Sequence, residues 1–166
     1  MDAKTKADRL YKDLLGPVNA RLAAMAYASA WRERCDEVQR EALRLCCAKY
    51  GPRRAELDGQ PITEPKHAWM MAESDWKDYY SEVDAVYRER GWIGKDEEFG
   101  VCPALKAEEL ERQASRAVIL AAEAHFPGVT VNTLLCSGLE KYNKYLCLLT
   151  ALVVNHPHYR KPAIAC

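Results

Sequence analysis

Residues 67–92 read HAWMMAESDWKDYYSEVDAVYRERGW and interleave large aromatic side chains with carboxylates. At about 100° per residue on a helical wheel, one set of apolar side chains falls within about 60° of one another. That stripe consists of Trp69, Trp76, Tyr80, Val83 and Tyr87. The stretch therefore predicts an amphipathic helix over residues 65–90 whose aromatic stripe forms one wall of a hydrophobic core.

The opposite side of the same predicted helix is acidic. Four carboxylates gather there within about 60°, and we call them the acidic ridge: Asp75, Asp78, Glu82 and Glu89. A catalytic carboxylate needs shelter from water to shift its pKa, and a ridge that faces away from the core offers little shelter. We therefore predict no catalytic residue here and interpret the ridge as a solvated face that can bind a basic partner.

Helical patterns continue on both sides of this stretch. Gly16 and Pro17 predict the end of an N-terminal helix over 1–15. Apolar residues spaced by three or four then predict a long helix over 18–50, which Gly51 and Pro52 end. The following segment, 51–64, is the main break and carries a turn signal that fits a small hairpin near 56–62.

The C-terminal half predicts three more helices. One begins after Pro103, a short one is capped by Thr130, and the last begins after Gly138. The sequence therefore predicts a single all-α domain over 1–166, an irregular bundle of five or six helices. Helices 18–50 and 65–90 form its antiparallel spine, and residues 155–166 form a loose tail.

Charge limits the classes of partner. The chain has 166 residues with 24 Lys and Arg against 24 Asp and Glu, so its formal net charge is zero. Binding nucleic acid by bulk charge needs an excess of cations, which argues against that class. Residues 64–111 hold 13 acidic and 6 basic side chains, a net of −7. An acidic middle favours a basic partner or self-association.

Cysteine usage and hydropathy indicate the compartment. Seven cysteines are present, and no CxxC occurs among them. Together with an N-terminal stretch that lacks the apolar core of a secretory leader, this predicts reduced thiols in a cytoplasmic protein. The longest apolar run, CLLTALVV over 147–154, is far shorter than the ~20 residues that a membrane helix needs. We expect no membrane association.

Motifs for metal, cofactor or nucleophilic chemistry are weak. His156 and His158, with Cys166 nearby, have ligand types that zinc accepts, but they fall in the predicted tail. Cys102 precedes a predicted helix, where a thiol pKa can fall, yet no histidine is close in sequence. No nucleotide-binding or hydrolase motif is present. We predict no metal site, no cofactor and no catalytic residue.

The leading hypothesis is a non-enzymatic protein that binds a basic protein partner through the acidic ridge. An accessory or inhibitory protein, for instance one carried by a phage or another mobile element, would fit such a face. A homodimer through the 18–50 helix is a second predicted association, because a helix of that length exceeds what a small domain can cover.

Two alternatives belong to other classes. The first is a small helical ligand-binding protein or enzyme with an aromatic pocket, built on Trp69, Trp76 or Trp92 with His125 or Cys102 as the reactive group. The second is a helix-turn-helix DNA binder at 120–144. Its candidate recognition helix, VNTLLCSGLEKY, carries little positive charge, which argues against contacts to phosphates.

Overall fold

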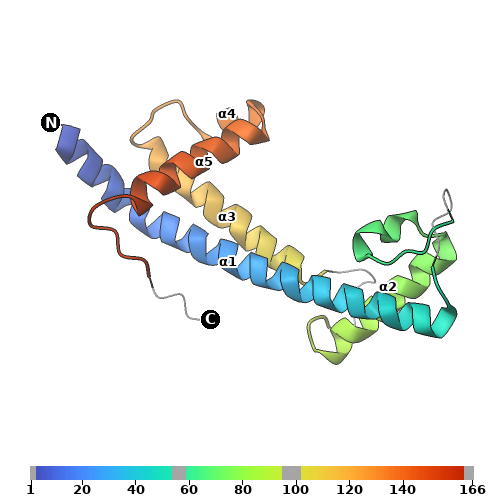
Figure 1. Cartoon of the computed structure of the whole chain (residues 1–166). Helices are drawn as coiled ribbons and strands as arrows, with labels where there is room; N and C mark the ends of the chain where they lie inside the picture. The colour runs from blue at the N-terminus through green and yellow to red at the C-terminus, as the bar shows by residue number, and fades with distance from the viewer. Residues whose placement is uncertain (1–2, 54–58, 95–101, 163–166) are drawn as a thin grey trace. The chain divides into compact units, whose positions relative to one another are not determined.

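The structure is a computed structural model that describes residues 3–53, 59–94 and 102–162 (Figure 1). It is 76% helical and has six helices, with no strand in these ranges. The helices are α1 (Ala3–Tyr50), the 3-10 helix η1 (Pro65–Met70), α2 (Glu73–Glu89), α3 (Ala104–Glu123), α4 (Val131–Cys136) and α5 (Leu139–Val154). The all-α prediction of five or six helices is confirmed. Part of the hairpin expected near 56–62 lies outside the described residues, and residues 59–62 form no strand.

The contacts within the chain group it into two units. Met1–Ala28 and Ala107–Cys166 form one, which we call the α5 unit. Ser29–Lys106 form the other, which we call the α2 unit. Each unit has its own buried apolar cluster. The single domain over 1–166 stays a prediction.

The extent of α1 differs from the prediction at one boundary. We expected Gly16 and Pro17 to separate a helix over 1–15 from one over 18–50, but α1 runs through both without a break. Pro17 has no N–H to donate to the carbonyl of Asp13, which removes one helical hydrogen bond. Leu14 and Val18, before and after the Gly-Pro pair, are both fully buried in the same cluster. Burial of Leu14 and Val18 stabilises the helical backbone across Gly16 and Pro17. The predicted end at Gly51 is confirmed, with φ 89° there.

Three helices build the core of the α5 unit (Figure 1). The N-terminal part of α1, α3 and α5 lie together because their apolar residues share one cluster: Leu14, Val18, Val118, Ile119, Ala122, Leu146, Leu149 and Val153. Thr130 caps α4 as predicted, since its hydroxyl accepts from the Thr133 backbone N–H. Gly138, at φ 102°, then turns the chain from α4 into α5.

The segment after α5 is held more firmly than we expected. The His156 ring stacks on Tyr11 with centroids 3.8 Å apart and 9° between the planes. Its Nε2 lies 3.4 Å from an Asp8 carboxylate oxygen. The Tyr159 hydroxyl donates to Asn19 Oδ1 over 3.3 Å. The expected loose tail is therefore anchored on α1 as far as Tyr159, and residues 163–166 lie outside the described part.

In the α2 unit, the C-terminal part of α1 packs against α2. Gln39 donates to the Tyr87 hydroxyl over 3.4 Å, and Lys49 donates to Glu82 over 3.1 Å. From Glu82 to Tyr87 along α2, the contacted residue of α1 changes from Lys49 back to Gln39. The two helices therefore run antiparallel, as predicted. The buried cluster includes Cys35, Val38, Ala42, Cys46, Tyr79, Val83, Tyr87 and Ile93.

The aromatic stripe predicted for 65–90 is only partly correct. Met71 and Ala72 are extended and separate η1 from α2. Trp69, on η1, is 75% exposed, because the break puts it out of register with α2. Trp76, in the first turn of α2, is 36% exposed. Tyr79, which the wheel left out of the stripe, is 1% exposed and joins Val83 and Tyr87 in the core.

Candidate functional site

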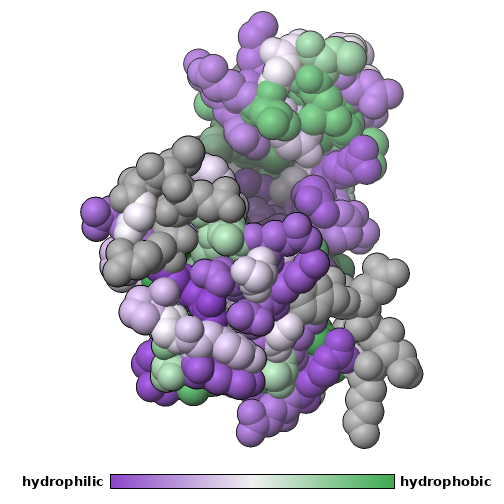
Figure 2. All heavy atoms as spheres, turned by 90° about the vertical axis from the view of Figure 1, so that its right-hand side faces the viewer, coloured by the Kyte–Doolittle hydropathy of each residue, from purple (hydrophilic) through white to green (hydrophobic). Residues whose placement is uncertain are grey.

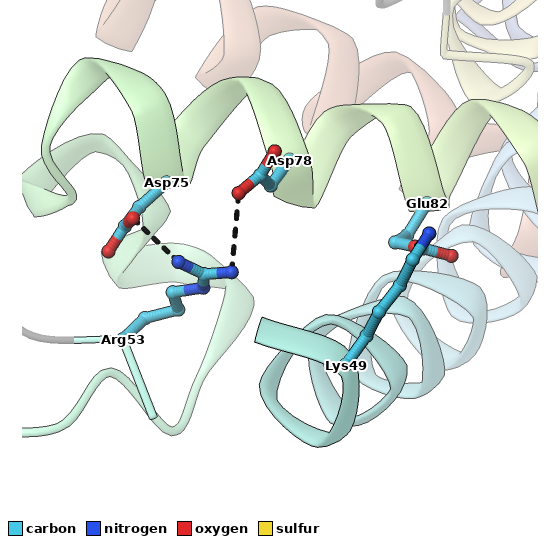
Figure 3. A network of polar contacts seen from close by, with 5 residues as sticks. All are labelled: Lys49, Arg53, Asp75, Asp78 and Glu82. Atoms are coloured by element: carbon cyan, nitrogen blue, oxygen red, sulfur yellow. Dashed lines mark hydrogen bonds and ion pairs between the residues drawn. The ribbon is translucent and has the colours of Figure 1, made fainter. Parts of the chain in front are cut away.

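The acidic ridge is the site that the sequence predicts, and the structure places a buried cation beside it (Figure 3). Arg53, three residues after the end of α1, donates from Nη1 to Asp75 over 2.6 Å and from Nη2 to Asp78 over 3.3 Å. The Arg53 side chain is only 7% exposed, while the two carboxylates are 24% and 37% exposed. A guanidinium that leaves water in this way needs carboxylate partners, so Asp75 and Asp78 satisfy an internal charge.

The surroundings of Arg53 explain why it stays charged. Burial alone would lower the pKa of its guanidinium, but the Cys46 thiol and the Asp75 carboxylate act against that, and the pKa is raised. The guanidinium carbon also lies 5.1 Å from the centre of the Tyr50 ring. Its Nε has no hydrogen-bond partner among the described residues. Arg53 is therefore a structural cation that ties the chain after α1 to α2.

A second cation engages the next acid of the ridge. Lys49, at the end of α1, donates to Glu82, and their side chains are 61% and 18% exposed. Hydrogen bonds to Tyr50 and Glu82 raise the pKa of the Lys49 ammonium. Glu89 is exposed and forms no ion pair with any residue in the described ranges.

The expected free acidic ridge is therefore corrected for three of its four members. Asp75, Asp78 and Glu82 pair with cations of the same unit, and Glu89 alone matches the expectation of a solvated acid. The sequence prediction missed both cations because Lys49 lies in the last turn of α1 and Arg53 follows that helix. Binding of a partner by these four acids stays a prediction.

The residues that the sequence suggested for metal or acid–base chemistry do not form one cluster. Within the described ranges, no group of three or more His, Cys, Asp or Glu side chains could hold a metal ion. His125 is engaged by Asp13, with Nε2 2.8 Å from the carboxylate oxygen. His158 lies beside His156, with ring centres 5.5 Å apart, and Cys166 is outside the described residues.

The aromatic residues of the alternative pocket do not gather in one place. Trp92 packs edge-on against Trp31 with centroids 5.2 Å apart and lies 5.8 Å from Tyr87, so these rings fill space within the core of the α2 unit. Trp69 is largely exposed on η1. Cys102 contacts Cys35, and this contact with burial raises the pKa of the Cys35 thiol, which disfavours a reactive thiolate.

The candidate DNA-reading segment is divided in two. α4 has only six residues, and Gly138 separates it from α5. A recognition helix that spans VNTLLCSGLEKY does not form, because α4 ends at Cys136. The DNA-binding alternative stays an untested prediction, and the divided helix does not support it.

A second surface, on α5, exposes large apolar side chains. Leu146, Leu149 and Val153 of α5 point into the core of the α5 unit. On its other side α5 exposes an outward face, made of Cys147, Leu148, Ala151, Leu152 and Val154. Leu148 is 57% exposed and Leu152 is 51% exposed.

A shallow depression adjoins this outward face. It has a volume of about 580 Å³, and its lining includes Leu148, Leu152, Tyr145 and Phe126. Phe126 is 36% exposed and packs edge-on to Tyr145 with centroids 6.5 Å apart. The Tyr145 hydroxyl is buried without a hydrogen-bond partner among the described residues.

No protein-family model, curated protein or solved structure matches this chain. Across residues 3–53, 59–94 and 102–162, no helix combines the length and the apolar character that crossing a bilayer requires.

Proposed function

We propose that this protein is a non-enzymatic protein-binding protein and that its partner packs on the outward face of α5. The observation that carries the proposal is that α5 is apolar over 146–154 at every position except Thr150, while only one side of it lies in a core. A helix that is hydrophobic on every side is normally buried on every side. An apolar face that a chain leaves in water is typical of a surface that another protein covers.

The energetics favour this surface over the acidic ridge. Covering an exposed leucine side chain stabilises a complex by about 1.5–3 kcal/mol when its full area leaves water. Leu148 and Leu152 each have about half of their area left to bury. The ridge acids would instead have to exchange their internal cations for those of a partner. A basic partner at the ridge is therefore kept as a separate proposal, with Glu89 as its most accessible member.

The kind of group with the largest pKa shifts among the described residues supports the non-enzymatic part of the proposal. The groups whose pKa values move most are Cys35, Tyr79 and Tyr87, and in each case contact and burial raise the pKa. A raised pKa keeps a thiol or phenol neutral at physiological pH, so these groups support packing more than nucleophilic chemistry.

Leu148→Lys tests the proposal. We expect it to weaken capture of the partner at least about 30-fold, because a lysine charge within a dry apolar interface costs about 2 kcal/mol or more. The measurement is quantitative affinity purification of the tagged chain from the cells that make it. An untagged second copy is co-expressed so that self-association is also scored.

Leu120→Lys is the matched control. Leu120 lies on α3 of the same unit and is 57% exposed, the same fraction as Leu148. Both variants should retain the helical circular dichroism of the unmodified chain, since both side chains project into water. Loss of one captured protein with Leu148→Lys alone supports the proposal. Equal capture by the unmodified chain and both variants, or no specific capture at all, contradicts it.

A further inference from the structure

A groove within the α5 unit lies on the side of α5 away from the outward face. It has a volume of about 430 Å³, which falls within the range of roughly 300–1,000 Å³ typical of small-molecule sites. Leu135, Leu139 and Leu146 line it, and Leu139 is 69% exposed. Figure 2 shows apolar side chains gathered at the top of the view, where α4 and the start of α5 lie in Figure 1.

A cation lines the same groove without a carboxylate partner. Arg21 of α1 donates from Nε to Ser115 over 3.2 Å and from Nη1 to Thr150 over 3.1 Å. Both acceptors are neutral hydroxyls, and Ser115 is only 7% exposed. A guanidinium has five N–H donors, so these two bonds leave donors for a ligand. Arg21 is half-buried and pairs with no acid in the described part of the chain.

A phenol and a second guanidinium stand beside it. Burial raises the pKa of Tyr142, while Arg116 and Arg21 lower it, so both cations lie near enough to act on the phenol. Arg116 of α3 is exposed and forms no ion pair with a described residue. Tyr142 lines the groove together with both arginines.

The net charge of the groove lining indicates the charge of a ligand that could bind there. Three arginines and two glutamates line it, which leaves a net of +1. One of the glutamates, Glu109, is held by Arg112 over 2.7 Å. The other two arginines, Arg21 and Arg116, both act on the Tyr142 phenol, and Arg116 also acts on Glu109. A single negative charge matches this excess, and the exposed leucines match an apolar body.

We propose that this groove binds a small organic monocarboxylate with an apolar body. Its carboxylate accepts hydrogen bonds from Arg21, Arg116 and the Tyr142 hydroxyl, and its apolar part packs on Leu135 and Leu139. A half-buried cation without a counterion is stabilised by such an anion, because charge-assisted hydrogen bonds are about twice as strong as neutral ones. The proposal does not rest on the protein-binding function, since the outward face of α5 takes no part in it.

The test uses 4-phenylbutyrate as the carboxylate and 4-phenylbutanamide as its neutral analogue of the same shape. Each is titrated into the isotope-labelled full chain, and binding is followed by NMR. We expect saturable shifts at the methyl groups of Leu135 and Leu139 with the carboxylate. The amide should bind at least about tenfold more weakly, because it forms no charge-assisted hydrogen bond.

Arg116→Gln separates the groove from the general charge of the chain, and Arg9→Gln is its matched control. Both arginines are exposed in the α5 unit, and both substitutions remove one positive charge. We expect Arg116→Gln to weaken binding of 4-phenylbutyrate about tenfold and Arg9→Gln to change it less than about twofold. Any one of three results would overturn the proposal. These are no saturation by 4-phenylbutyrate up to about 10 mM, equal affinity for the amide, or an equal loss of affinity in the two variants.

Discussion

Tyr79→Ala is expected to destabilise the α2 unit by about 3–5 kcal/mol, the range for removing a buried aromatic side chain from a core. Tyr79 is 1% exposed and its ring lies 4.9 Å from that of Tyr80. Burial raises the pKa of its phenol. Alanine would leave a cavity that the surrounding helices can close only in part.

Trp69→Ala is the control for this prediction. Trp69 is 75% exposed, so its removal should change the stability by no more than about 0.5 kcal/mol. All four tryptophans of the chain lie within 29–106, so denaturant unfolding followed by tryptophan fluorescence reports on the α2 unit. A large loss with Trp69→Ala and a small one with Tyr79→Ala would instead support the stripe predicted from the helical wheel.

Arg53→Ala should also destabilise the α2 unit, by about 2–3 kcal/mol. Removing one partner of a buried ion pair costs about 3–5 kcal/mol, because the other partner is left without a counterion. We expect a smaller value here because Asp78 is 37% exposed and water can solvate part of its charge. The expected loss arises from Asp75 and Asp78 facing each other with no cation between them.

Arg44→Ala is the control for the ion pair. Arg44 pairs with Glu41 over 2.7 Å, but its side chain is 67% exposed. Its removal should leave the midpoint of fluorescence-detected unfolding unchanged within error, because an exposed pair adds little stability. If Arg53→Ala leaves the midpoint equally unchanged, the network in Figure 3 does not hold the α2 unit together.

The sequence places the four acids of the ridge on one predicted helix face, but it does not reveal the cations that pair with three of them. A helical wheel shows which side chains oppose the aromatic residues, and it contains no other part of the chain. Arg53 lies 22 residues before Asp75, so no periodicity within α2 can announce it. The signal that was available is the basic residue in the break after α1, next to a helix with an excess of acids.

Two other differences also depend on contacts with parts of the chain that are distant in sequence. Gly16 and Pro17 favour the end of a helix, but burial of Leu14 and Val18 outweighs one lost hydrogen bond, and burial depends on α3 and α5. The run CLLTALVV indicates a core helix, and it does supply core residues. A three-helix core covers only one side of α5, however, so the same run also predicts an exposed apolar face.

The central claim is that a protein covers the outward face of α5, and two cysteines allow a direct measurement. Cys147 lies on that face and Cys136 lies on α4, and both thiols are exposed. A membrane-permeant maleimide is applied to the cells that make the protein and, separately, to the dilute purified chain. Mass spectrometry then gives the labelling rate of each cysteine. We predict at least about tenfold slower labelling of Cys147 in cells than after purification, with Cys136 unchanged, since a covered thiol cannot meet the reagent. Equal labelling of Cys147 in both settings would contradict the claim.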